Sequence, residues 1–397
     1  MLTGQVHPAF EKTARVLERQ LSAGGGAALC VYHRGECVVD TWGGVRNREG
    51  DPWERDTLAL SYSTTKGVAS TLLHILVDRG LVDYDAPVAE YWPEFAAAGK
   101  DSITVRQVMC HEAGLYDVRG MIDHARRMLD WAYMTEVLAA ARPAHEPGAT
   151  HGYHGLTYGW LVGEIVERVS GMSFSEFLAR ELAEPLGLDG LYVGVPDRAL
   201  ARCADLLPSV VTQGDPGTTN RVEGFLERST RILRRMRVPI DIDSLGAALL
   251  PKGMEELDFN SRAFRQAVIP AANGMFTARS LARMYALLAA DGELEGQRLI
   301  GRSTVWRASE VQNTSTGRVI PLPMHWRLGY HRVATLGVRI PNGFGHFGFG
   351  GSGAWCDPDR GLAVALTLNS GIGTPFGDMR MVRIATAACR AVDRRRD

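Results

Sequence analysis

Hydrophobic and polar positions follow two different periods along the chain. Residues 9–21 repeat apolar positions at helical spacing, and two β-rich runs then flank the turn "HRGE" (33–36), as in a hairpin. A helix is predicted through "GVASTLLHILVDRG" (67–80), and Gly80 is its expected end. After the helix predicted over residues 9–21, the chain therefore runs through strands and enters a second helix soon after residue 63.

The middle of the chain, residues 86–264, shows mainly helical patterning. The clearest segments are "ITVRQVMCHEAGL" (103–115), "MTEVLAAAR" (134–142), "TYGWLVGEIVERVSG" (157–171) and "SFSEFLARELAEPLGL" (173–188). A helix is next predicted in "NGMFTARSLARMYALLAADG" (273–292). The β-rich runs "RLGYHRV" (327–333), "GFGHFGFGGSGAWCDP" (343–358) and "LAVALTLNS" (362–370) follow, and a last helix covers 377–393.

This order of strands, helices and strands predicts an α+β fold with a discontinuous domain. Residues 1–85 and 265–397 are expected to build one α/β domain, and residues 86–264 a helical domain inserted between its halves. We expect a cleft at the junction of the two domains.

Composition and charge remove several classes of function. The 397 residues are 45% hydrophobic and 22% charged with a net charge of -1, which is typical of a soluble globular protein and gives no reason to expect nucleic acid or an anionic membrane as partner. No run of 18 apolar residues occurs, and the first residues lack the pattern of a signal peptide, so a cytoplasmic location is expected. A homo-oligomer is left open.

The six cysteines are scattered without a CxxC pair or a cluster with histidine. They predict buried thiols in place of a disulfide framework or a zinc site. No metal or other cofactor is expected.

The stretch "STTK" (63–66) stands out because the chain contains 4 lysines against 40 arginines. Ser63 falls where an apolar-periodic helix begins, so Lys66 lies on the same face one turn later. Arginine cannot lose its proton in a protein, whereas a partly desolvated lysine can become a base. The alternative interpretation is a helix-capping serine followed by a surface lysine.

Two further stretches carry candidate chemistry. Tyr153 lies in a glycine-broken turn ahead of a strongly apolar helix, where a phenol can point into a cleft, although a lone tyrosine is more often structural. His346 and Gly348 lie in a glycine-rich strand whose backbone can approach a ligand and donate an N–H group to an oxyanion. The same glycines also suit a bulge.

The joint order of Ser-x-x-Lys, a tyrosine about 90 residues later and a glycine-rich His-x-Gly strand resembles the serine β-lactamase and penicillin-binding-protein superfamily. More narrowly, the chain is similar to the β-lactamase-like carboxylesterases related to class C enzymes, the family VIII esterases. This resemblance covers most of the chain. It implies a β-lactamase/transpeptidase-like fold, in which helices flank a central antiparallel sheet and an all-helical domain is inserted.

The resemblance also implies roles for individual residues. Ser63 is the expected acylated nucleophile, Lys66 its activator, and Tyr153 the tyrosine of the family's Tyr-x-Asn motif, which shuttles a proton. The backbone N–H groups of Ser63 and Phe349 are expected to form the oxyanion hole. These roles agree with the general need of a hydroxyl nucleophile for an adjacent base.

Departures from the family's motifs suggest the substrate. His346, Phe347 and Gly348 match the Lys-Thr-Gly strand, so a histidine replaces the lysine that would bind a carboxylate. Gly155 replaces the asparagine of Tyr-x-Asn, whose amide would bind a substrate amide. Both changes favour small neutral esters over β-lactams, and any residual lactamase activity is expected to rise toward pH 6 as His346 becomes protonated.

A short-chain carboxylesterase acting on a small-molecule ester is therefore the leading hypothesis. An acyltransferase on the same scaffold, a weak β-lactamase or amide hydrolase, and a non-catalytic scaffold protein are the alternatives. The esterase motif G-x-S-x-G is absent, which leaves an α/β-hydrolase without a nucleophile.

The segment 215–262 decides the shape of the pocket in this hypothesis. Its apolar residues either line an acyl pocket or close the helical domain, and we favour the second interpretation. They are Phe225, Leu226, Leu249, Leu250 and Met254.

Overall fold

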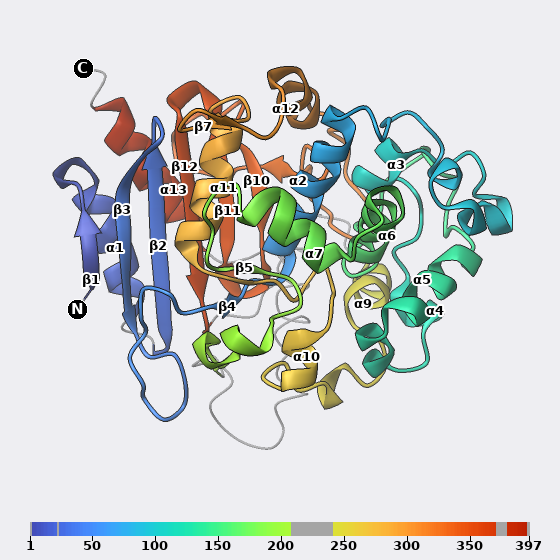
Figure 1. Ribbon diagram of the computed structural model, residues 1–397, viewed down its shortest axis with the longest axis horizontal. Helices are drawn as coiled ribbons and strands as arrows, with labels where there is room; N and C mark the ends of the chain where they lie inside the picture. The colour runs from blue at the N-terminus through green and yellow to red at the C-terminus, as the bar shows by residue number, and fades with distance from the viewer. Residues whose placement is uncertain (1, 22–23, 208–240, 371–378, 395–397) are drawn as a thin grey trace.

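A seven-stranded antiparallel sheet with the order β1-β3-β2-β12-β11-β10-β9 forms one half of the protein (Figure 1). This computed structural model describes residues 2–21, 24–207, 241–370 and 379–394. The strands of the sheet are β1 (Thr3–Val6), β2 (Gly26–His33), β3 (Glu36–Gly44), β9 (His331–Arg332), β10 (Phe344–Phe347), β11 (Gly353–Asp357) and β12 (Leu362–Leu368).

The first and last segments of the chain meet in this sheet. Strand β12 pairs with β2 along its whole length, from Leu362 opposite His33 to Leu368 opposite Ala27. The predicted hairpin is present, since β2 and β3 are joined by Arg34 and Gly35, which both have the positive φ that a tight two-residue turn requires. The α+β fold is thereby confirmed, while the domain limits at 85/86 and 264/265 remain a prediction.

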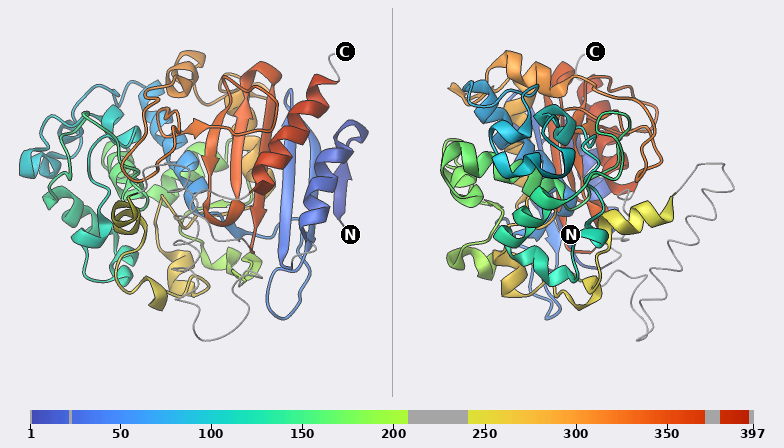
Figure 2. Two further views of the ribbon diagram at one scale, coloured as in Figure 1. Left: turned by 180° about the vertical axis from the view of Figure 1, so that it is seen from behind. Right: turned by 90° about the vertical axis from the view of Figure 1, so that its right-hand side faces the viewer.

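Helices cover both faces of the sheet. Helices α1 (Glu11–Leu21) and α13 (Met379–Asp393) pack against each other on one face, which Figure 2 shows from behind. Helix α11 (Ala278–Ala289) packs on β2, β11 and β12 from the other face, where α2 (Thr65–Asp78) lies beside β10. Alternate residues of β12 explain the two layers: Leu362, Val364 and Leu366 face α13, whereas the small Ala363 and Ala365 let α11 approach closely.

The helical half lies beside the sheet and is built mostly from short helices (Figure 1). They are α3 (Val105–Met109), α4 (Val118–Met121), α5 (Trp131–Ala140), α6 (Tyr158–Ser170), α7 (Phe174–Leu178), α9 (Ile242–Leu249) and α10 (Arg262–Gln266). Helix α12 (Arg302–Ser309) and the hairpin of β7 (Glu293–Leu294) and β8 (Gln297–Arg298) lie at the top of Figure 1. A small sheet of β4 (Ala59–Leu60), β6 (Met275–Phe276) and β5 (Leu191–Tyr192) links segments from both halves.

Two predicted helices are shorter than their hydrophobic patterns indicate. The helix expected over 103–115 ends at Met109 because His111 takes a left-handed φ of 64°, which stops the helical ladder. The helix expected over 173–188 is regular only over Phe174–Leu178 and then widens into a π-turn over Ala179–Ala183. Apolar spacing alone does not show either change of backbone.

Composition predicts buried thiols and no membrane-spanning segment. Five of the six cysteines are buried, as predicted, and Cys37 is half-buried with its sulfur 3.8 Å from that of Cys30. None of the helices in the described part of the chain has the length and apolar character that a membrane crossing requires.

Candidate active site

Ser63 lies in a short 3-10 turn, Tyr62–Thr64, between β4 and α2. Tyr62 has a φ of 45°, a left-handed conformation that a bulky residue rarely adopts. The Thr65 hydroxyl holds this bend, because it donates to the Tyr62 carbonyl at 2.5 Å and accepts from the Gly274 N–H at 3.0 Å. The strained turn presents the half-buried Ser63 hydroxyl just before the start of α2.

Lys66 lies one turn further on and is fully buried, so the interpretation as a surface lysine is wrong. Its Nζ lies 3.1 Å from Ser63 Oγ, and it donates to the carbonyl oxygens of Gly155 at 2.7 Å and Ala271 at 2.9 Å. Burial among these uncharged neighbours lowers the pKa of Lys66 well below that of an ordinary lysine. A neutral amine has two N–H bonds, which the two carbonyl groups accept, and a lone pair that is free to face the Ser63 hydroxyl.

Tyr153 reaches the same hydroxyl from the turn before α6. Its phenol donates to Ser63 Oγ at 2.9 Å, and its ring stacks on Trp326 with centroids 5.6 Å apart and planes at 9°. Burial raises the pKa of Tyr153 above its usual range, so the phenol keeps its proton. The structure thus brings Ser63, Lys66 and Tyr153 together, although 90 residues separate the first from the last.

Two buried histidines hold the turn that carries Tyr153. The Leu115 N–H donates to His154 Nε2 at 3.0 Å, and the His154 N–H donates to His111 Nδ1 at 3.2 Å. Burial lowers the pKa of His154 to about 3, which keeps its ring a neutral acceptor. The sequence analysis missed both residues because a buried histidine carries no distinguishing pattern.

The predicted oxyanion hole lies where β10 ends beside the Ser63 turn. No described residue accepts a hydrogen bond from the N–H of Ser63 or of Phe349. Gly348 lets the two segments approach, since a Cβ at that position would lie only 2.3 Å from the Ser61 carbonyl oxygen. The Ser352 hydroxyl ties them by donating to the same carbonyl at 3.0 Å. An oxyanion hole requires two such unpaired donors beside an attacking hydroxyl, so this arrangement is compatible with the prediction.

His346 differs from the prediction in its burial and in its charge state. It is 2% exposed, and its Nδ1 donates to the Phe347 carbonyl at 3.0 Å, which leaves Nε2 as a buried acceptor with no partner in the described part of the chain. Burial and the neighbouring His331 lower its pKa well below 6.5. This lowered pKa contradicts the expectation that His346 is protonated near pH 6, and it removes the reason for expecting lactamase activity to rise toward that pH.

His331 is a further residue that the sequence analysis missed. It lies on β9 opposite Gly345, and its Nε2 accepts the Phe347 N–H at 3.0 Å while its Nδ1 donates to the Arg332 carbonyl at 2.8 Å. Its ring therefore extends the pairing of β10 beyond the end of β9 and fixes the backbone that leads to Phe349.

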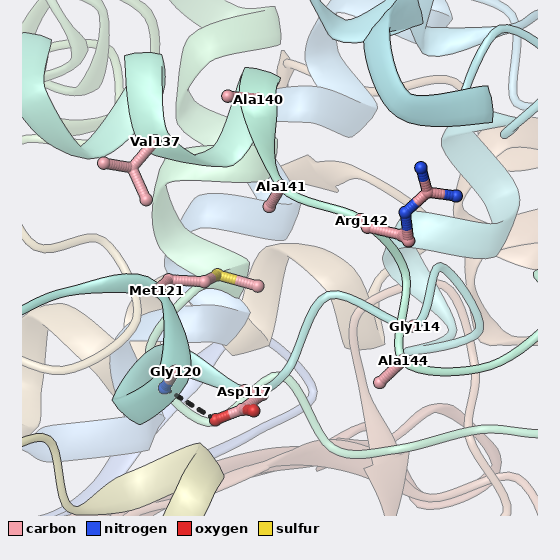
Figure 3. Close-up of a pocket in the computed structure, with 9 residues that line it drawn as sticks. All are labelled: Gly114, Asp117, Gly120, Met121, Val137, Ala140, Ala141, Arg142 and Ala144. Atoms are coloured by element: carbon pink, nitrogen blue, oxygen red, sulfur yellow. Dashed lines mark hydrogen bonds between the residues drawn. The ribbon is translucent and has the colours of Figure 1, made fainter.

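A cavity of about 470 Å³ lies in the helical half of the protein, away from the side chains of Ser63, Lys66 and Tyr153 (Figure 3). Helices α4 and α5 supply much of its wall, and the Asp117 carboxylate at its edge accepts the Gly120 N–H at 2.9 Å. Its lining is Gly114, Asp117, Gly120, Met121, Val137, Ala140, Ala141, Arg142 and Ala144, and it includes none of Ser63, Lys66 and Tyr153.

The α+β fold, the half-buried Ser63, the desolvated Lys66 one turn later and the buried Tyr153 together match the class of serine β-lactamase-like proteins. The comparison with protein families agrees with this class. The chain belongs to the beta-lactamase family, whose model matches residues 14–388.

Individual relatives include both esterases and penicillin-binding proteins. The chain is 40% identical over 348 residues to the esterase/beta-lactamase LipL of Mycobacterium tuberculosis, covering 87% of this chain and 77% of LipL. The crystal structure of a family VIII carboxylesterase has a TM-score of 0.85 at 34% identity, with 98% and 100% of the two chains covered. A penicillin-binding-protein homologue from Caulobacter crescentus has a TM-score of 0.84 at 34% identity and the same coverage.

Proposed function

We propose that this protein hydrolyses short-chain carboxylic esters through an acyl intermediate on Ser63. The chain is a carboxylesterase of the β-lactamase-like type, which its likeness to LipL and to the family VIII carboxylesterase supports. The main support for an acyl intermediate on Ser63 is the contact of Ser63 Oγ with both Lys66 Nζ and Tyr153 OH.

Acylation begins with the neutral amine of Lys66. The Ser63 hydroxyl gives its proton to Lys66 Nζ while Oγ attacks the ester carbonyl carbon, and the carbonyl oxygen becomes an oxyanion. The N–H groups of Ser63 and Phe349 stabilise that oxyanion, because they need no reorganisation when the charge develops. The carbonyl groups of Gly155 and Ala271 keep the ammonium of Lys66 in place.

The second half of acylation returns the proton to the leaving group. The tetrahedral intermediate collapses as the bond from carbon to the alkoxy oxygen breaks, and Tyr153 OH protonates that oxygen while accepting a proton relayed from Lys66. Water then attacks the acyl-Ser63 carbonyl, and the same groups act in reverse to release the acid and restore the Ser63 hydroxyl.

The surroundings of the three side chains favour neutral esters. His346 is neutral and buried, so β10 offers no cation for the carboxylate of a β-lactam, and Gly155 offers no side-chain amide. An ester also has a better leaving group than an amide and depends less on such contacts.

We expect kcat/KM for p-nitrophenyl butyrate to exceed that for a penicillin or for nitrocefin by about tenfold to a hundredfold. A lost hydrogen bond to a charged group costs about 1.5–3 kcal/mol, and each 1.4 kcal/mol is about tenfold. Because the pKa of His346 lies well below 6.5, the ring stays neutral at pH 6, and lactam hydrolysis should not rise between pH 8 and pH 6. Steady-state kinetics with both substrate types across this pH range measure both points.

The variant His346→Lys provides the matched comparison, since it returns a cation to β10 and should narrow the ratio of ester to lactam turnover. A wild-type preference for a lactam over every ester tested would refute the substrate class. The proposal that Ser63 is the nucleophile would still stand after that result.

The variant Tyr153→Phe should lower kcat by about 10²–10³-fold, within the range of about 10²–10⁴-fold that a positioned proton donor contributes. The phenyl ring can still stack on Trp326, so the unfolding temperature should change little. Tyr116→Phe is the control, because Tyr116 lies in the same buried cluster and should keep its activity. Near-normal turnover by Tyr153→Phe would remove the proposed proton relay.

A further inference from the structure

The backbone beside the proposed base leaves no room for a side chain at position 155. The Gly155 carbonyl accepts a hydrogen bond from Lys66 Nζ at 2.7 Å, so position 155 borders the reacting groups. A Cβ there would lie 2.3 Å from Leu249 Cδ2 and 2.8 Å from the Ala248 carbonyl oxygen. Glycine is therefore required, because the C-terminal end of α9 occupies the space into which an asparagine side chain would extend.

Helix α9 is fixed in this position. Leu245 and Ala248 are buried in an apolar cluster together with Tyr153 and Trp326. On its other side α9 packs against α4, where the Arg119 guanidinium donates to the Leu250 carbonyl at 2.7 Å. Helix α9 appears in yellow beside α4 in Figure 1. The C-terminal end of α9 is thus held by packing and by a hydrogen bond, so it has a fixed position beside Gly155.

We propose that Leu249 determines which acyl groups the enzyme accepts, by presenting an apolar wall at the place where the motif's amide would otherwise bind the substrate. Leu249 is half-buried and packs against the cluster that contains Tyr153. A branched aliphatic side chain offers no hydrogen bond, so it favours a short uncharged alkyl chain over an acyl group with an amide next to its carbonyl. This inference rests on the proposed function, because it assigns the substrate class of the same site.

Phe225 and Leu226, which the sequence analysis grouped with Leu249, lie outside the described residues. Leu250 is 38% exposed, and Met254 packs against the main core. The favoured interpretation, that these residues close the helical domain, therefore fits Met254. We assign Leu249 to the proposed acyl pocket instead.

The test compares Leu249→Ala, Leu249→Phe and Leu250→Ala on p-nitrophenyl acetate, butyrate, hexanoate and octanoate. Leu249→Ala should raise the ratio of kcat/KM for hexanoate to that for acetate at least about tenfold, because a pocket discriminates one methylene by about ten- to two-hundredfold. Leu249→Phe should shift the preference toward acetate. Leu250→Ala removes the same side chain from the adjacent exposed position and should leave the ratio within about twofold of wild type, since a surface change contributes little.

Thermal unfolding checks that each variant is folded, and Leu249→Val serves if Leu249→Ala is not. A serine-directed phosphonate applied to all variants separates the two proposals. Labelling of Ser63 with an unchanged acyl-chain ratio in the Leu249 variants would overturn this inference alone. Failure of the phosphonate to label wild-type Ser63 would overturn the proposed function, and the inference with it.

Discussion

The variant Ser63→Ala should lose at least about 10⁴-fold in kcat/KM for p-nitrophenyl butyrate, because removal of a nucleophile leaves only the oxyanion donors and substrate binding. The fold should persist, since the half-buried Ser63 hydroxyl has hydrogen bonds only with Lys66 Nζ and Tyr153 OH among the described residues. Steady-state kinetics and thermal unfolding measure the two effects separately.

The control for this variant is Ser303→Ala, which removes the same hydroxyl from an exposed position on α12. It should leave kcat/KM unchanged. Ester hydrolysis at the wild-type rate by purified Ser63→Ala would show that another residue is the nucleophile.

The variant Lys66→Arg should lower kcat/KM by about 10²–10⁴-fold, the range for loss of a positioned base. Both side chains can carry a positive charge, but only lysine can lose its proton and act as a neutral amine at ordinary pH. Because burial lowers the pKa of Lys66, the wild-type rate should rise with pH and reach its plateau well below pH 10.5. A pH profile of kcat/KM with p-nitrophenyl butyrate measures this limb.

Lys100 offers a matched control for that substitution. It is the other fully buried lysine in the described part of the chain, its Nζ donates to three backbone carbonyl groups, and burial lowers its pKa to about 8. Lys100→Arg should affect stability much as Lys66→Arg does and should leave the pH limb in place. Equal losses of activity in both variants would make Lys66 a structural residue.

Local elements of the fold could be predicted because their signals are short-range. The hairpin around Arg34 and Gly35 follows from a turn sequence between two β-rich runs, and α2 from apolar spacing that ends at Gly80. The contact between Ser63 and Lys66 is equally local, since three residues span one helical turn. Only the family resemblance predicted that Tyr153 would join them.

The rest of the site depends on atoms that carry no sequence signal. The Gly155 and Ala271 carbonyl groups around Lys66 belong to the backbone, so their role as acceptors cannot be predicted from the side chains at these positions. The neutral state of His346 results from its burial beside His331, which a strand pattern does not reveal. Gly155 was interpreted as a lost amide, whereas the structure shows that α9 permits no side chain there.

The most direct test of the central claim is to treat the protein with a p-nitrophenyl phosphonate, which forms a stable adduct with an activated serine. Intact mass and peptide mapping should show one adduct per chain on the peptide that contains Ser63, with ester hydrolysis lost in proportion to labelling. The Ser63→Ala protein should remain unlabelled. An adduct on a different residue, or full ester hydrolysis by protein labelled at Ser63, would contradict the account.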